Sequence, residues 1–180
     1  FGKFLSHGLP ALPGDTPRLS DWTTHLTTVF PQVRLTRYLE MRGADTGEIR
    51  TRVPALAALW AGLLYDPQVL DNAWQEVSTW TAEERRQLET EVARQGFQTP
   101  FRERRLLDLC QWMVDQSRLG LQRRGVLDED GRDESIYLEP LQEVLDAGCT
   151  YAEILLKRFN QEWNGNIDKT MSELCRETLA

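Results

Sequence analysis

The sequence predicts an α+β protein that is mostly helical and has one strand, at about residues 33–42. Two observations support this fold class. Helix start and stop signals recur from residue 53 to residue 178, and one earlier segment alternates polar and apolar side chains. Hydrophobic residues make up 41% of the 180 positions, which suits a folded core, and we treat 1–180 as a single unit.

Local signals delimit the helices. The apolar run from Val53 to Tyr65, with Pro54 near its start, predicts a buried helix. Thr99-Pro100 predicts the start of a long helix that continues to about Arg124. Two capping boxes, in which a threonine and a glutamate three residues later satisfy free backbone N–H groups, predict further helix starts: Thr81 with Glu84, and Thr150 with Glu153.

The alternating segment 33–42 predicts a strand with one apolar face and one polar face. Five polar or charged side chains share one face: Arg34, Thr36, Tyr38, Glu40 and Arg42. Arg37 falls on the other face. Because a lone strand cannot satisfy its own N–H and C=O groups, we expect partner strands from a missing N-terminal part of a longer protein.

Glu40 and Arg42 are the residues on this strand that suggest chemistry. They lie two residues apart on one face. A carboxylate can hold Mg²⁺, and an arginine fork can hold a phosphate, so the pair suits a magnesium nucleotide that transfers its terminal phosphate. A solvated outer strand face is the alternative interpretation, because this spacing is common in proteins.

Composition excludes several kinds of partner and site. The net charge of −7 argues against nucleic acid or an anionic membrane as the main partner. The longest apolar run is shorter than the roughly 20 residues that span a bilayer. Two histidines are too few for a multi-histidine metal site. The three widely spaced cysteines predict reduced thiols, and we expect a cytoplasmic protein.

Several segments match a known family in order along nearly the whole chain. The most specific runs from Arg34 to Asp45. The others are Leu9-Pro10 with Pro13-Gly14, Thr24 to Leu35, Pro54 to Leu56, Leu59-Trp60, Gly62 to Asp66, Trp80 to Arg85, Thr99 to Arg102, and Glu162-Trp163 with Gly165. Together they resemble glutamate–cysteine ligases of the plant and proteobacterial type.

The resemblance implies a glutamine synthetase-like fold for the full protein, with an antiparallel sheet curved around a funnel-shaped active site. This chain would be the C-terminal part of the catalytic domain, with the N-terminal part of the same protein as its partner and a homodimer left open. It implies ATP-dependent ligation of the γ-carboxylate of L-glutamate to L-cysteine through a γ-glutamyl phosphate, the first step of glutathione biosynthesis. ATP and Mg²⁺ would be the cofactors, and we expect this chain alone to be inactive.

The family motif also implies roles for individual residues. Glu40 corresponds to a metal-binding carboxylate and Arg42 to a phosphate-binding arginine, and both are expected to be catalytic. Arg34, Arg37 and Tyr38 are expected to be neighbours that bind substrate or nucleotide. Two other functions remain open: a related glutamate–amine ligase of another thiol pathway such as ergothioneine, and a non-catalytic helical interaction module derived from the ligase.

Overall fold

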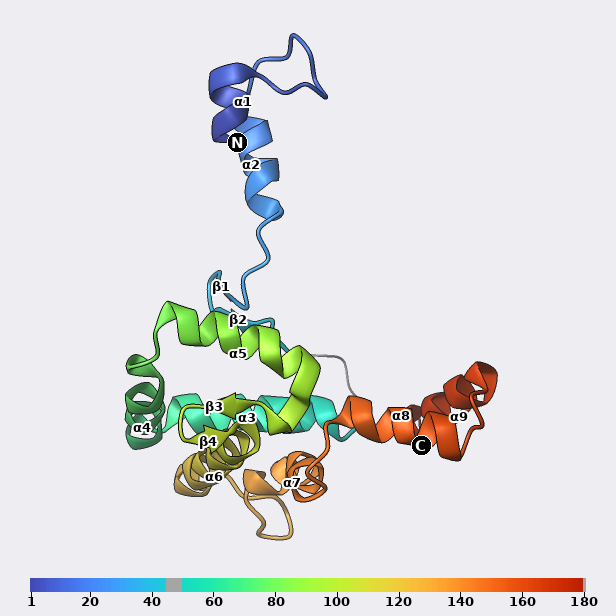
Figure 1. The fold of residues 1–180 in the computed structure, drawn as a ribbon. Coiled ribbons are helices and arrows are strands. Elements are labelled where there is room, and N and C mark those ends of the chain that lie inside the picture. Colours follow the sequence, from blue (N-terminus) through green and yellow to red (C-terminus); the bar gives the residue numbers. More distant parts are fainter. Residues whose placement is uncertain (45–49, 180) are drawn as a thin grey trace. The chain divides into compact units, whose positions relative to one another are not determined.

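The computed structural model describes residues 1–44 and 50–179, with side chains through residue 175. The chain divides into two compact units, Phe1–Asp45 and Thr46–Ala180, where the sequence analysis treated it as one. Most of the described residues are helical, and the strands form two small antiparallel sheets (Figure 1). The predicted mostly helical character is therefore confirmed.

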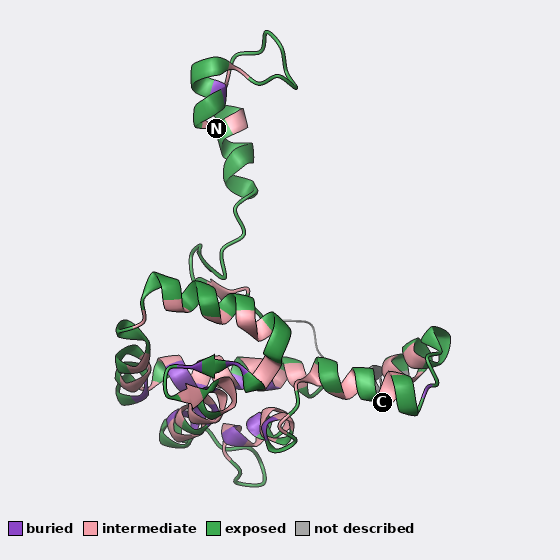
Figure 2. Cartoon of the chain, viewed as in Figure 1, coloured by how far each residue is buried: buried purple, intermediate pink, exposed green. Residues whose placement is uncertain are grey.

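The first unit is small and buries little. Within its described residues, Phe4 is the one buried hydrophobic side chain (Figure 2). A unit of this size with so little apolar burial has only marginal stability of its own. Its elements are α1 (Gly2–His7), α2 (Leu19–Thr27), β1 (Val33–Leu35) and β2 (Leu39–Met41).

The prediction of a single strand at 33–42 is wrong, because this segment contains two strands, β1 and β2, that form an antiparallel hairpin. Arg34 lies directly across from Glu40 in this pairing. The chain reverses at Thr36 to Tyr38, where the Thr36 N–H donates to the Tyr38 carbonyl oxygen at 2.9 Å. The two strands therefore satisfy part of each other's backbone, and this pairing does not need the outside strands that the sequence analysis invoked.

The second unit is built around α3. Figure 1 shows this helix with α4, α6 and α7 around it, and α3 makes its most extensive contact with α6. Its helices are α3 (Arg52–Tyr65), α4 (Pro67–Ser78), α5 (Ala82–Gln95), α6 (Leu106–Arg124), α7 (Glu139–Asp146), α8 (Tyr151–Gln161) and α9 (Ile167–Leu179). Shorter elements are η1 (Gly96–Gln98), β3 (Pro100–Phe101), β4 (Arg104–Arg105) and η2 (Glu134–Leu138).

Both capping boxes form as predicted. The Glu84 N–H donates to the Thr81 hydroxyl at 3.1 Å, and the Thr81 N–H donates to the Glu84 carboxylate at 2.7 Å. Thr150 and Glu153 make the same reciprocal pair at the start of α8. These bonds satisfy N–H groups that would otherwise have no partner within the helix.

The backbones of α3 and α6 touch where both helices carry small residues. A Cβ at Gly62 would lie 2.2 Å from the carbonyl oxygen of Ser117, and a Cβ at Gly120 would lie 2.0 Å from the carbonyl oxygen of Gly62. The Ser117 hydroxyl donates to the Ala58 carbonyl oxygen at 3.2 Å. Only glycine at positions 62 and 120 permits this approach.

The core of the second unit lies around this crossing (Figure 2). It forms where α3, α6, α7 and η2 meet, so residues far apart in the sequence share one apolar cluster. Burying each valine or leucine of this cluster contributes roughly 1.5–3 kcal/mol. The buried members are Ala58, Val114, Leu121, Leu138 and Leu145.

The helix predicted to start at Thr99-Pro100 starts later, at Leu106. Residues 100–105 instead form the β3–β4 hairpin, with Arg102 at a φ of 53° in its turn. A positive φ is uncommon for a residue with a Cβ, and tertiary contacts must stabilise it. α6 then begins where the Arg105 N–H donates to the Asp108 carboxylate at 2.9 Å.

Contacts of Arg102 with the α4–α5 corner stabilise that turn. Its Nε donates to Glu84 Oε1 at 2.8 Å, and two other guanidinium nitrogens donate to the hydroxyl and carbonyl oxygens of Thr79, each at 2.9 Å. Next to it, the Trp80 and Phe101 rings lie 4.6 Å apart in an edge-to-face arrangement. The hydrogen bond from Arg102, with those from Thr81, lowers the pKa of Glu84 to about 2.

None of the described helices is alone both long and apolar enough to cross a membrane. Within the described residues, one pair of helices, α3 and α4, reaches that length and composition when taken together, and the pair is bent by 93° at its junction.

The close crossing of α3 and α6 predicts an unusual response to substitution. Gly62→Ala or Gly120→Ala should destabilise the second unit by about 3 kcal/mol, because the added methyl group would collide with backbone. Intrinsic helix propensity alone would give the opposite sign, by about 1 kcal/mol. Urea denaturation followed by circular dichroism measures the difference. Gly2→Ala, a helical glycine with nothing within 4 Å of its Cβ position, is the control that should not destabilise.

The lowered pKa of Glu84 predicts how stability depends on pH. Because its folded pKa is about 2 and its ordinary value is 4.5, the carboxylate stabilises the fold above pH 4.5, and this contribution is lost as pH falls toward 2. Glu84→Gln keeps a capping group but removes the charge. It should lower the melting temperature at pH 7 and reduce the fall in stability between pH 4.5 and pH 2.

Glu83→Gln is the matched control, because that neighbouring side chain is 74% exposed and pairs only with Arg86 in the described part of the chain. Equal pH profiles for the two variants would show that the Arg102 contact is not what stabilises the corner.

Candidate functional site

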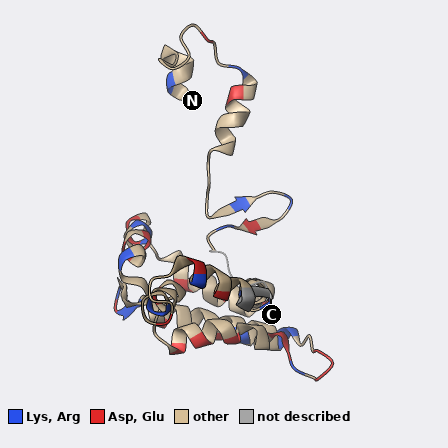
Figure 3. Ribbon diagram, turned by 90° about the vertical axis from the view of Figure 1, so that its right-hand side faces the viewer, with Lys and Arg blue, Asp and Glu red and all other residues tan. Residues whose placement is uncertain are grey.

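The two strands of the first unit bring three charged side chains together. Arg34 Nε lies 2.7 Å from Glu40 Oε2, and Arg42 Nε lies 3.9 Å from the same oxygen. The side chains of Arg34, Glu40 and Arg42 are 51%, 34% and 23% exposed. Figure 3 shows the basic and acidic positions on the two strands of the hairpin. One carboxylate is thus flanked by two guanidinium groups, and we call this set the hairpin cluster.

Arg42 is the most enclosed member of the hairpin cluster. Its backbone N–H donates to the Gln32 carbonyl oxygen at 2.8 Å, and its guanidinium carbon lies 5.3 Å from the centroid of the Phe30 ring. Its Nη1 is buried and has no hydrogen-bond partner among the described residues. A buried donor without a partner is costly, and an anionic oxygen would satisfy it.

Phe30 and Gln32 were missed by the sequence analysis. Phe30 lies directly before Pro31, four residues ahead of the polar strand face that begins at Arg34. Its aromatic ring beside a guanidinium is a favourable arrangement that sequence spacing does not reveal, because it depends on how the chain turns after α2.

Arg37 and Tyr38 lie apart from the hairpin cluster in the turn between β1 and β2. The Tyr38 side chain is 69% exposed, and its backbone N–H is 3.4 Å from the Thr36 hydroxyl oxygen. The two-residue alternation that placed Tyr38 on the same face as Glu40 is interrupted by this turn. Roles for Arg37 and Tyr38 in binding substrate or nucleotide remain predictions.

The hairpin cluster has one carboxylate, so it cannot enclose a metal ion by itself. Among the described residues, no group of three or more His, Cys, Asp or Glu side chains could hold a metal. Mg²⁺, however, is commonly bound by one or two carboxylates together with substrate phosphates and water. Glu40 beside Arg34 and Arg42 therefore fits a magnesium ion that arrives with a phosphate group, and does not fit a metal held by protein alone.

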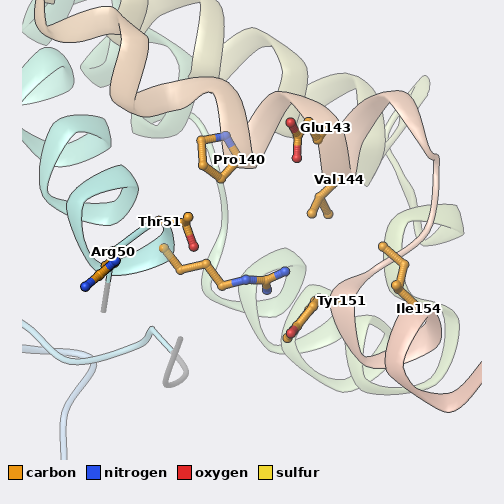
Figure 4. A pocket seen from close by; sticks show the side chains of 8 residues that line it. Arg50, Thr51, Pro140, Glu143, Val144, Tyr151 and Ile154 are labelled. Atoms are coloured by element: carbon orange, nitrogen blue, oxygen red, sulfur yellow. The ribbon is translucent and has the colours of Figure 1, made fainter. Parts of the chain in front are cut away.

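A separate pocket of about 460 Å³ lies in the second unit (Figure 4). Arg50, Thr51 and Arg52 line it near the start of α3, and Glu143 and Tyr151 line it from α7 and α8. The Arg52 guanidinium lies over the Tyr151 ring. Apolar side chains complete the wall: Pro140, Val144 and Ile154. The pocket combines charges of both signs with an apolar wall and shares no residue with the hairpin cluster.

The three cysteines form no disulfide with one another. All are free thiols, with Cys149 and Cys175 exposed and Cys110 partly buried. Cys110 lines an apolar cavity of about 180 Å³ between α3, α6 and α7, and burial raises the pKa of its thiol. An unreactive small core residue is what this environment favours.

Comparison with known proteins agrees with the family resemblance. A family described as glutamate–cysteine ligase family 2 matches residues 6–174. The chloroplastic glutamate–cysteine ligases of Solanum lycopersicum and Arabidopsis thaliana are each 43% identical to this chain over 174 residues. The Nicotiana tabacum protein of the same name is 44% identical. These alignments cover 97% of this chain and 32% of each relative, so the chain spans about a third of their length.

The names of these relatives correct one expectation. Each is called chloroplastic, whereas the reduced cysteines led us to expect a cytoplasmic protein. The cytoplasmic prediction is wrong by this comparison. Its physical weakness is that free thiols indicate a reducing environment, which more than one compartment provides.

The cysteine environments predict two rates of thiol modification. At pH 8, an aromatic disulfide reagent should modify the exposed thiols of Cys149 and Cys175 quickly. Its reaction with Cys110 should be slower by about tenfold or more, because that thiol is shielded and ionises less readily. Denatured protein should show three equally reactive thiols. Three equal rates in the folded protein would contradict the placement of Cys110 in the core.

Proposed function

The chain belongs to glutamate–cysteine ligase family 2, and we propose that it forms part of an enzyme that joins L-glutamate to L-cysteine at the expense of ATP. The observation that supports this most directly is the hairpin cluster. It lies in the segment from Arg34 to Asp45, which carries the most specific family resemblance, and it presents two guanidinium groups beside one carboxylate.

The proposed reaction requires a site of this charge. The γ-carboxylate of glutamate is a poor electrophile, so ATP phosphorylates it to an acyl phosphate, which the cysteine amine then attacks. Negative charge accumulates where the carboxylate meets the triphosphate. Fixed cationic donors at that place stabilise the transition state because they do not need to reorganise. Arg42, whose Nη1 is buried without a described partner, would bind an oxygen of the transferring phosphate.

Glu40 would hold Mg²⁺ that arrives with the nucleotide. When bound, Mg²⁺ neutralises phosphate charge and polarises the bond that is broken. Glu40 lies on β2 and Arg42 directly after that strand, so Glu40 would fix the position of the Mg²⁺ charge relative to Arg42. Arg34 lies across the strand pair from Glu40 and would contribute a second guanidinium at the same place.

The rest of the active site would come from outside this chain. The chain spans about a third of its curated relatives, and the hairpin cluster would supply one metal-binding carboxylate, Glu40. We assign the remaining carboxylates and the glutamate site to the rest of a family-length protein with a glutamine synthetase-like sheet, in which β1 and β2 would be two of the strands. Such an enzyme would serve glutathione biosynthesis.

Two substitutions test this assignment in the family-length enzyme. Glu40→Gln keeps the side-chain shape but removes the charge that would hold Mg²⁺, and Arg42→Lys keeps the charge but loses the planar fork. Each should lower kcat by on the order of 10²-fold, as the loss of one preorganised transition-state group does. ATP-dependent formation of γ-glutamylcysteine measures kcat, and the melting temperature shows whether the fold survives.

The matched controls are Glu89→Gln and Arg86→Lys on the exposed face of α5, which should leave kcat unchanged. Wild-type turnover in Glu40→Gln or in Arg42→Lys would remove that residue from the active site. Membership of the family would then support a shared fold for this chain but not a catalytic role for that residue.

A further inference from the structure

We propose that Arg34 is a positioning residue that holds the Glu40 carboxylate while the site contains no cation and releases it when a divalent cation binds. The inference rests on the proposed function, because it concerns how the same carboxylate is made available to Mg²⁺. It assigns to Arg34 a role beyond contact with substrate.

The strand pairing makes the Arg34–Glu40 contact specific. The two residues are direct partners in the antiparallel register, so their side chains lie on the same face of the hairpin. Arg34 Nε donates to Glu40 Oε2 at 2.7 Å, a charge-assisted hydrogen bond of ordinary length. Arg42 is 3.9 Å from that oxygen, too far for a hydrogen bond. The closer guanidinium is therefore the one that occupies the oxygen.

A cation and Arg34 would compete for Glu40. Mg²⁺ requires its oxygen ligands at about 2.0–2.1 Å in octahedral geometry, so the ion and its other ligands would crowd a guanidinium that is hydrogen-bonded to the same carboxylate. The two positive charges would also repel each other at that distance. Because both side chains are partly exposed, the ion pair is weak enough to exchange, and its presence should lower the affinity of Glu40 for a cation about two- to fivefold.

The exchange would have a consequence for phosphate binding. Arg34, once displaced from Glu40, remains on the same hairpin face as Arg42, so two guanidinium groups would then be available to one phosphate. In the cation-free protein, Glu40 instead neutralises part of that charge. Cation binding and phosphate binding at the hairpin would therefore favour each other.

The experiment uses Mn²⁺ as a paramagnetic probe of the hairpin in the 180-residue chain. Mn²⁺ is titrated at about 0.15 M ionic strength, where exposed charges are screened, and the broadening of backbone amide signals in residues 33–42 gives the local affinity. Arg34→Gln removes the ion pair and should increase that affinity about two- to fivefold. Arg34→Lys retains the charge and should restore much of the wild-type affinity. Circular dichroism of each variant checks that the fold is retained.

Arg37→Gln is the matched control. It removes the same charge from the same hairpin, and in the described part of the chain Arg37 forms no ion pair with Glu40. It should change the affinity by less than about 1.5-fold, because exposed charges without contact are largely screened. Equal increases in Arg37→Gln and Arg34→Gln would show an effect of net charge alone and would overturn the exchange, while the proposed ligase function would stand.

Glu40→Gln separates the two proposals. If Glu40 is the cation ligand, this variant should lose the Mn²⁺-dependent broadening of the hairpin signals. If wild type and Glu40→Gln respond identically, the cation does not bind Glu40. That outcome would overturn both the exchange and the metal role of Glu40, and it differs from the result that overturns the exchange alone.

Discussion

Gly62 of α3 lies against Ser117 and Gly120 of α6 so closely that neither helix could carry a larger side chain at the contact without moving apart. The packing of the neighbouring core side chains depends on this short distance between the α3 and α6 backbones. Leu121 is fully buried one residue beyond Gly120, and it shares a cluster with Leu138 of η2. If the two backbones separated, these side chains would lose close contacts whose dispersion energy falls steeply with distance.

Two glutamate–arginine pairs, Glu84 with Arg102 and Glu40 with Arg34, differ in how many hydrogen bonds each carboxylate accepts. Glu84 is saturated with donors, since one oxygen accepts from Arg102 and the other from Arg102, the Thr81 N–H and the Thr81 hydroxyl. A carboxylate in that state has no position left for a cation, so it serves to join α5 to the β3–β4 turn. The described contacts of Glu40 reach one oxygen and come from arginine side chains alone. Such a carboxylate can change partners.

Signals that act over a few residues were readable from the sequence, and long-range contacts were not. The Thr81 and Thr150 caps depend on glutamates three residues away, so their positions follow from local geometry. The start of α6 was misplaced because the turn at Arg102 is stabilised by Glu84, 18 residues earlier. The β1–β2 turn has none of the Gly, Asn or Pro residues that indicate a hairpin. Alternation still identified Glu40 and its two arginines.

The negative net charge of the chain disfavours anionic partners, whereas the positive charge of its hairpin favours them. The two observations agree once the short range of electrostatic forces in salt solution is considered. A net charge of −7 disfavours a polyanion, which contacts an extended surface and meets its average charge. A nucleotide at one site meets only charges within about 8 Å at physiological salt. Residues 33–42 contain three arginines and one glutamate, so the local charge is positive. An acidic protein can therefore bind a triphosphate, provided that its basic residues are concentrated where the phosphates lie.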